Sequence, residues 1–277
     1  MIKFYAVVVL YNKKVQESIT IRCLLDNTDD KFSIIVLDNS EEMYIEENAN
    51  SYNDDRIKYY KMDGNIGLSK AYNYALSLLK AKNGNDIVIW FDDDTLVRRE
   101  YFECLKKFSE DLLYDVFVPI IYGQDGIIYS PNKVGFLKGK YIKTPGQAIP
   151  QNKFNAINSC LAVRLRAYQG YRYDEGLFMD CVDTKLFDDF RKKKMHFCVL
   201  PVKTEQNFFQ RNPERNLQKY ISRFKIRIKD TLYYSKLNGI KGKVSGYIRI
   251  VGWSIVYGIK LRSFKFCCMC IYQMLSS

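Results

Sequence analysis

Hydrophobic residues in the first 110 positions form short continuous runs that alternate with stretches of helical spacing. The runs are typical of buried strands and occupy residues 4–10, 32–37, 57–62 and 87–91. Apolar residues recur at helical spacing in residues 15–25, in residues 67–79, and from Tyr101 through Leu105 and Phe108 to Leu112. This alternation predicts an α/β fold with a mainly parallel sheet flanked by helices.

The later part of the chain has other patterns. Residues 122–151 are rich in Gly, Pro, Lys and Tyr and are predicted to form an irregular flap. Beyond Asn212-Pro213 the pattern is helical, with lysines and arginines interleaved among apolar residues: Leu217, Tyr220, Ile221, Phe224, Ile228 and Leu232. Residues 248–261 continue this pattern. We therefore expect a catalytic domain over residues 1–210 and a basic amphipathic helical extension over residues 211–277.

Charge supports this division. The 277 residues carry a net charge of +12, but residues 191–277 alone hold 19 Lys and Arg against three acids. The first 190 residues are therefore slightly acidic. A near-neutral domain followed by a basic tail suggests an anionic partner for the tail, either a membrane surface or nucleic acid.

Several classes of protein are disfavoured. Eight cysteines and one histidine fit a reducing compartment; five cysteines are scattered without zinc-ligand spacing, and the cluster Cys267-Cys268-x-Cys270 lacks a fourth ligand. No window of 18 apolar residues occurs, and the first apolar run is too short for a signal peptide, so we expect a cytoplasmic or peripheral protein. A dinucleotide fingerprint and a P-loop are both missing from the sequence.

The most informative stretch is the apolar run 87–91, which ends in Asp92, Asp93 and Asp94. Along an extended segment Asp92 and Asp94 point to one side and Asp93 to the other. Adjacent carboxylates repel each other, and oxygen ligands suit Mg²⁺ or Mn²⁺. The alternative is a solvated acidic turn that caps the next helix.

Polar clusters follow three of the predicted strands. They are Tyr11-Asn12, Asp38-Asn39-Ser40 and the three aspartates. Because ligands of open α/β sheets bind beyond the carboxyl ends of the strands, these clusters together predict one site.

The chain resembles the family 2 glycosyltransferases of the GT-A fold, particularly the bacterial rhamnosyltransferase-like branch. The resemblance covers roughly residues 4–205 and rests on five pieces in the family's order: residues 8–12 (VVLYN), 36–40 (VLDNS), 65–73 (NIGLSKAYN), 91–94 (FDDD) and 173–183 (YDEGLFMDCVD).

The resemblance implies a site for a dTDP- or UDP-linked sugar. Asp38 would accept a hydrogen bond from the pyrimidine, and Asp92 and Asp94 would hold Mg²⁺ or Mn²⁺ on the donor diphosphate. The other residues implied in binding the nucleotide sugar are Tyr11, Asn12, Asn65, Gly67, Asn73 and Asp93. Gly67 has the alternative of a plain helix start.

The resemblance also implies an inverting transfer to a hydroxyl, with one carboxylate as general base. Asp183 stands at the family's position for this base. Asp180, three residues earlier, is the alternative, or it orients Asp183 or the acceptor. The alternative for both acids is that they have no catalytic role and only stabilise a helix N-terminus by interacting with the helix dipole.

Three departures from the family's pattern concern its site. Cys160 stands where small residues are common, and an arginine expected on the base-bearing helix is shifted to Arg191 or missing. A metal-binding histidine after residues 197–201 is replaced by Glu205, Gln206 and Asn207. His196 lies too early, inside the expected strand, and is predicted to be structural.

The function expected on this basis is transfer of a sugar to a glycan or polyprenyl-linked acceptor in cell-surface polysaccharide biosynthesis. The tail would bind an anionic membrane at the inner face, or pack on the catalytic domain as a helical pair. Two alternatives are a nucleic-acid-binding protein and a sugar nucleotidyltransferase. The strand-end carboxylates disfavour the former, and the sequence after the first strand lacks the Gly-rich loop of the latter.

Overall fold

The computed structural model describes residues 2–48, 54–137, 139–209 and 216–276. A central eight-stranded sheet has the order β11-β5-β10-β4-β1-β2-β3, with β6 paired to β5. The first four strands are β1 (Phe4–Leu10), β2 (Phe32–Asp38), β3 (Ile57–Lys61) and β4 (Ile87–Asp92). These four are mutually parallel, as the sequence predicts.

The remaining strands complete the sheet. They are β5 (Val116–Gly123), β6 (Ile128–Ser130), β10 (Leu161–Arg164) and β11 (Phe197–Gln206). β11 runs parallel to β5, whereas β10 is antiparallel to both of its neighbours. A small second sheet joins β7 (Asn132–Lys133), β8 (Lys140–Tyr141) and β9 (Phe154–Asn155). The segment expected to be an irregular flap therefore contains short strands.

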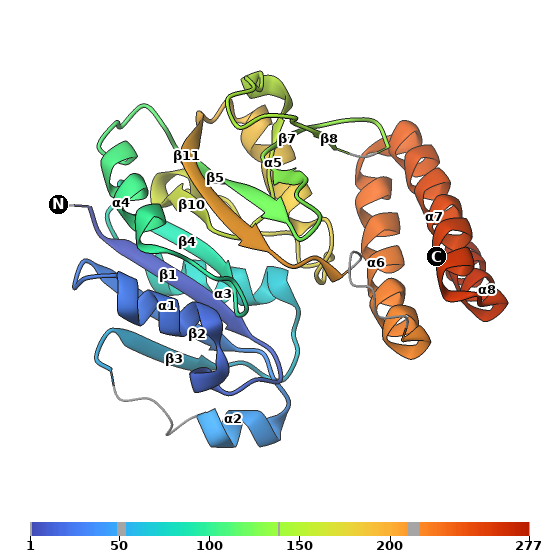
Figure 1. Ribbon diagram of the computed structural model, residues 1–277, viewed down its shortest axis with the longest axis horizontal. Coiled ribbons are helices and arrows are strands. Elements are labelled where there is room, and N and C mark those ends of the chain that lie inside the picture. The colour runs from blue at the N-terminus through green and yellow to red at the C-terminus, as the bar shows by residue number, and fades with distance from the viewer. Residues whose placement is uncertain (1, 49–53, 138, 210–215, 277) are drawn as a thin grey trace.

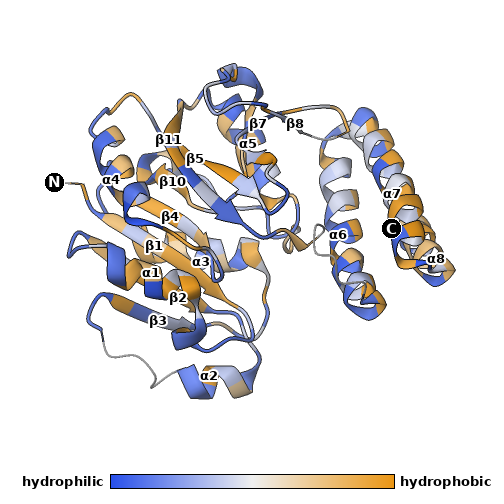
Figure 2. Ribbon diagram, in the orientation of Figure 1, coloured by the Kyte–Doolittle hydropathy of each residue, from blue (hydrophilic) through white to orange (hydrophobic). Residues whose placement is uncertain are grey.

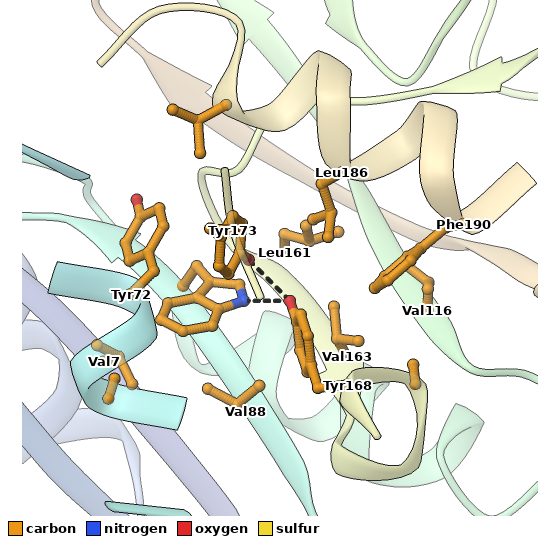
Figure 3. Packing of buried hydrophobic residues seen from close by; sticks show 14 of the residues in the cluster. Val7, Tyr72, Val88, Val116, Leu161, Val163, Tyr168, Tyr173, Leu186 and Phe190 are labelled. Carbon is orange, nitrogen blue, oxygen red and sulfur yellow. Dashed lines mark hydrogen bonds between the residues drawn. The ribbon is translucent and has the colours of Figure 1, made fainter. Parts of the chain in front are cut away.

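Helices cover both faces of the sheet (Figure 1). They are α1 (Ile19–Asn27), α2 (Glu42–Asn48), α3 (Leu68–Leu79), α4 (Arg99–Phe108) and α5 (Val182–Lys192). Alternate residues of β1 point to opposite faces, so Val7 packs in the cluster with α3 and α5 while Val8 packs in the cluster with α1 and α4. In the first cluster the indole N–H of Trp90 donates to the Tyr168 hydroxyl at 2.8 Å (Figure 3).

Two of the predicted helices differ in the structure: one is divided into two parts, and the other is shorter than expected. The expected helix over 15–25 is a short 3₁₀ turn, Val15–Glu17, followed by α1. Ser18 separates the two because its side chain caps the N-terminus of α1 by accepting the N–H of Ile21. The expectation that Leu112 belongs to the next helix is wrong, since α4 ends at Phe108 and Leu112 is exposed.

The C-terminal part contains α6 (Leu217–Leu237), α7 (Gly239–Leu261) and α8 (Phe264–Leu275). These helices lie side by side to the right of the central sheet in Figure 1 and contact one another. They share a hydrophobic cluster that includes Tyr220, Phe224, Ile250 and Phe266. The predicted apolar stripe of α6 is thus confirmed. The expected domain boundary at residues 210–211, and Asn212-Pro213, lie outside the described residues.

Candidate functional site

The carboxyl ends of the parallel strands bring the polar clusters to one edge of the sheet. In the strand register, Leu10 is paired with Asp38 and Val9 with Asp92. Tyr11, which follows Leu10, is about half exposed at this edge. The three clusters predicted from the sequence therefore meet.

Hydrogen bonds connect the loops at this edge into one surface. The backbone N–H of Asn12 donates to Ser40 Oγ at 2.8 Å, and Asn12 Oδ1 accepts the N–H of Glu41 at 3.0 Å. The Asn39 side chain donates to Asn65 Oδ1 at 3.0 Å. Asn12 and Asn65 thus have fixed positions on this surface.

Asp38 lies beneath this surface with no solvent exposure. Its Oδ1 accepts the N–H of Ser40, and its Oδ2 accepts from Asn48 at 2.7 Å and from the Tyr59 hydroxyl at 2.7 Å. In this conformation Asp38 holds the strand-end loop together. Because the carboxylate is fully buried, a pyrimidine could reach it only if the surrounding loop moved.

Two further predicted residues support the edge instead of being open to a ligand. Asp93 Oδ1 accepts from the Lys13 ammonium at 2.6 Å, which fixes the loop after β1. Asn73 donates to Tyr173 O and Glu175 and accepts the N–H of Tyr173. Because its side chain is buried in these bonds, Asn73 anchors the segment before α5, and its place on the nucleotide wall stays a prediction.

Gly67 joins the start of α3 to that same segment. Its φ is +84°, and an added Cβ would lie 2.6 Å from the Phe178 ring and 2.8 Å from Phe178 O. The next residue, Leu68, donates its N–H to Phe178 O at 2.6 Å. Gly67 is therefore required by both backbone conformation and close approach, and is more than a plain helix start.

Asp92 lies at the floor of the edge beside Gln206, the last residue of β11. Gln206 Nε2 donates to Asp92 Oδ2 at 2.6 Å. Burial raises the pKa of Asp92 to about 6, and the negative charges of Asp94 and Asp93 raise it in addition. In the segment where the family's metal-binding histidine was expected, Gln206 is thus the residue that contacts Asp92.

The donor set fits a hard divalent cation in part. Asp94 is exposed next to Asp92, and Gln206 Oε1 is buried with no hydrogen-bond partner among the described residues. Oxygen ligands of this kind suit Mg²⁺ or Mn²⁺, which commonly complete their coordination with water and phosphate. Within the described ranges, no group of three or more His, Cys, Asp and Glu side chains could hold a metal ion by itself.

Asp183 is, like Asp92, a partly buried carboxylate of the site. It lies in the first turn of α5, where its Oδ1 accepts the Thr184 N–H at 2.6 Å. Burial raises the pKa of Asp183 to about 6, and the bonds from Thr184 oppose this shift. A carboxylate with this pKa is suited to act as a general base near neutral pH.

Asp92 and Asp183 line one cavity of about 240 Å³. Tyr72, Gln206 and Ser159 also line it. Cys160 does not, because it is buried in the cluster on the other face of the sheet. The same cavity thus contains Asp92, a candidate metal ligand, and Asp183, a candidate base.

Asp180, the alternative base, is paired with α6. The Arg223 guanidinium binds both oxygens of its carboxylate, and Arg227 Nε lies 3.9 Å from Oδ1. Asp180 precedes α5, which begins at Val182, so it does not share a helix turn with Asp183. Both oxygens of the Asp180 carboxylate are thus occupied by Arg223, whereas Asp183 forms no ion pair with a described residue, so Asp183 stays the preferred candidate for the base.

α6 also holds the backbone of this segment. Asp230 is fully buried and accepts the N–H groups of Phe178, Met179 and Asp180 at 3.0, 2.7 and 2.7 Å. Asp230 and Arg223 were missed as site residues because α6 reads from the sequence as an amphipathic basic helix. A lone acid among its cations was the available signal. The expected Arg191 pairs instead with Asp188.

The comparisons with known proteins agree on a family. The family model described as Glycosyl transferase family 2 matches residues 5–172. The dTDP-rhamnosyl transferase RfbF of Shigella flexneri is 24% identical over 185 residues, which are 65% of this chain and 60% of that protein. The chain thus spans about three fifths of the length of this curated relative.

Solved structures match the fold at low identity. GalNAc-T7 with UDP, GalNAc and Mn²⁺ gives a TM-score of 0.59 at 13% identity, covering 100% of this chain and 58% of that chain. The mannosyltransferase PcManGT from Pyrobaculum calidifontis, in complex with GDP-Man and Mn²⁺, gives 0.55 at 12%, covering 99% and 87%. TarS 1–349 of S. aureus gives 0.52 at 16%, covering 98% and 79%.

Proposed function

The chain belongs to glycosyl transferase family 2, and on that basis we propose that it is an inverting glycosyltransferase using a dTDP- or UDP-linked sugar. The observation that carries the mechanism is the shared cavity of Asp92 and Asp183, two carboxylates whose pKa values are both raised to about 6. The relative named for dTDP-rhamnosyl transfer supports a deoxyhexose donor.

In this proposal the donor binds over the strand ends. Tyr11, Asn12, Asn65 and Gly67 contact the nucleotide, with Asp38 and Asp93 fixing their loops. Asp92 and Asp94 hold Mg²⁺ or Mn²⁺, with Gln206 able to supply a third oxygen. When bound, this ion neutralises negative charge on the diphosphate. The Mn²⁺ in two structurally similar transferases supports this assignment.

The Asp183 carboxylate is the proposed base. It takes the proton from the acceptor hydroxyl while that oxygen forms a bond to the anomeric carbon. The bond between this carbon and the diphosphate oxygen breaks, and the nucleoside diphosphate leaves with the electron pair. One displacement inverts the anomeric configuration, and no covalent enzyme intermediate is needed.

The proposed acceptor is a glycan or a polyprenyl-linked glycan at the inner face of the cell membrane, as in cell-surface polysaccharide biosynthesis. No helix within the described part of the chain is long and apolar enough to cross a membrane. Peripheral attachment is supported by exposed apolar side chains on α7 and α8, such as Ile259 and Phe264, among basic residues (Figure 2).

A donor screen tests this function. The protein is incubated with Mn²⁺ and each of several dTDP-, UDP- and GDP-linked sugars, and thermal unfolding and release of nucleoside diphosphate are measured. We expect a dTDP- or UDP-sugar to raise the unfolding temperature and to be hydrolysed slowly. No stabilisation and no hydrolysis with any donor would contradict the proposal.

A further inference from the structure

A second, larger cavity adjoins the site on the side of the C-terminal helices. Its volume is about 490 Å³, and Asp180, Cys181 and Asp183 line it as well as the smaller cavity. Its other walls come from residues 129–141, α6 and α7. A molecule in the larger cavity therefore has access to Asp183 while a donor fills the smaller one.

The segment between β7 and β8 closes this cavity against α7. Figure 1 shows this segment reaching from the small sheet to the upper ends of α6 and α7. Ser245 of α7 donates its hydroxyl to Phe136 O at 2.6 Å, which fixes that contact. The cavity is thus built by both the catalytic part and the C-terminal helices.

The cavity carries an excess of positive charge. Because Arg223 neutralises Asp180, its remaining charged side chains are Asp183 against Arg227, Lys241 and Arg249. Arg227 Nη1 is buried and has no hydrogen-bond partner in the part of the chain that the structure describes. A buried donor without a partner is costly, so its position is explained best by an anionic ligand.

Arg249 is placed to act with Arg227. The guanidinium carbon of Arg249 lies 5.2 Å and that of Arg227 4.6 Å from the centre of the Trp253 ring, and both residues line the cavity. No described carboxylate lies within ion-pair distance of Arg249. Guanidinium groups that line one cavity can bind phosphate oxygens through several charge-assisted hydrogen bonds.

The apolar surface of α7 begins next to this charged wall. Lys241, Ser245 and Arg249 recur every four residues and line the cavity, so they share one face of the helix. Val244, Ile248 and Ile255, which lie on the adjoining face of the helix, are 48%, 48% and 57% exposed. Figure 2 shows the hydrophobic stretches of α7 and α8 on this outer part of the molecule.

We propose that the larger cavity binds the phosphate group of a lipid-linked acceptor. Arg249, Arg227 and Lys241 bind the phosphate, the sugar end points to Asp183, and the lipid chain lies along the exposed face of α7. This inference rests on the proposed function and assigns its acceptor a chemical class and a place.

The test uses binding of probes to the full chain in EDTA, which removes metal-dependent binding at Asp92 and Asp94. Farnesyl diphosphate, inorganic pyrophosphate and farnesol are titrated by calorimetry. We expect farnesyl diphosphate to bind more tightly than either of the others. Arg249→Gln should weaken its binding at least about tenfold, because charge-assisted hydrogen bonds are lost. Lys243→Gln, on the same helix but outside the cavity, should leave binding unchanged.

Three results would overturn the proposal. If farnesol binds as tightly as farnesyl diphosphate, the phosphate is not recognised. If pyrophosphate binds as tightly, the lipid chain does not contribute. If both Arg249→Gln and Lys241→Gln bind farnesyl diphosphate as the parent does, the ligand does not bind in this cavity. Binding of UDP or dTDP with Mn²⁺ is measured on the parent and on each variant. If the parent protein binds neither nucleotide, the proposed function is contradicted instead. If a variant binds the nucleotide as the parent does, the variant is correctly folded.

Discussion

The Asp230 carboxylate accepts the backbone N–H of Asp180 at 2.7 Å, although fifty residues separate the two in sequence. Together with the bonds to Phe178 and Met179, this contact fixes the segment from which α5 and its Asp183 emerge. The proposed base is therefore positioned from α6, in the part of the chain expected to be a tail.

Asp230→Asn should lower the rate of transfer more than it weakens donor binding. An asparagine keeps only one of the two acceptor oxygens, and its N–H₂ would face at least one of the three N–H donors, so about 1–3 kcal/mol of stability should also be lost. Transfer, nucleoside diphosphate binding and urea unfolding are compared with the exposed α6 variant Lys225→Gln. Parent-like transfer at full occupancy of both substrates would show that Asp230 has no positioning role.

Asp183→Asn should keep donor binding but reduce transfer by on the order of 10²–10⁴-fold, since the proton acceptor is lost. Its matched control is Asp189→Asn on the same helix, whose carboxylate pairs with Lys185 instead. Asp180→Asn should cost less in transfer. Near-normal turnover of the Asp183 variant would move the base to another residue.

The pH dependence follows from the same carboxylate. A base must be deprotonated, and the pKa of Asp183 is about 6, so transfer should fall as pH drops below about 6. Asp92 has a similar pKa, and its protonation would weaken metal binding in the same range. Measuring kcat with saturating Mn²⁺ separates the two. A kcat that stays constant down to pH 4.5 would contradict Asp183 as the base.

Asp94→Ala should abolish metal-dependent binding of UDP or dTDP and leave the fold intact, because Asp94 is exposed at a turn. Calorimetry with and without Mn²⁺ measures the effect, and Glu100→Ala, another exposed acid, is the control. If the Asp94 variant binds nucleotide with Mn²⁺ as the parent does, the metal assignment is wrong.

Gly67→Ala should destabilise the protein by more than Gly64→Ala. Both glycines have positive φ, +84° and +68°, so each substitution costs on the order of 1–3 kcal/mol in backbone strain. Only at Gly67 would the new methyl group also collide with Phe178, whereas Gly64 has nothing within 4 Å. Chemical denaturation of the two variants measures the difference. Equal losses would mean that the Phe178 segment moves freely away from α3.

Replacing both Ile248 and Ile255 with glutamate should reduce binding to vesicles rich in anionic lipid. These side chains are exposed, so stability should change little, while apolar contact is lost and like charge is added. Sedimentation with vesicles of increasing anionic lipid content is the measurement. The control is Leu112→Glu, a substitution of an exposed leucine that lies outside the C-terminal helices. Unchanged sedimentation would contradict membrane attachment through α7.

The parallel sheet and its functional edge could be predicted because each depends on local signals. An apolar run such as residues 87–91 predicts a buried strand, and the acids that follow it predict that the site lies at the carboxyl end of that strand. The roles of Asp38 and Asn73 could not, since burial and partners such as Tyr59 and Tyr173 arise only on folding. The docking of α6 was equally hidden, because an amphipathic pattern shows that a helix packs but does not show against what.

The contacts of α6 have a consequence for how the protein is made. Because α6 (residues 217–237) follows Asp183 in the chain, the contacts of Asp230 with the segment before α5 form only after α6 has been synthesised. A chain shortened before Leu217 therefore keeps the strand-end carboxylates but loses the acceptor oxygens that hold residues 178–180.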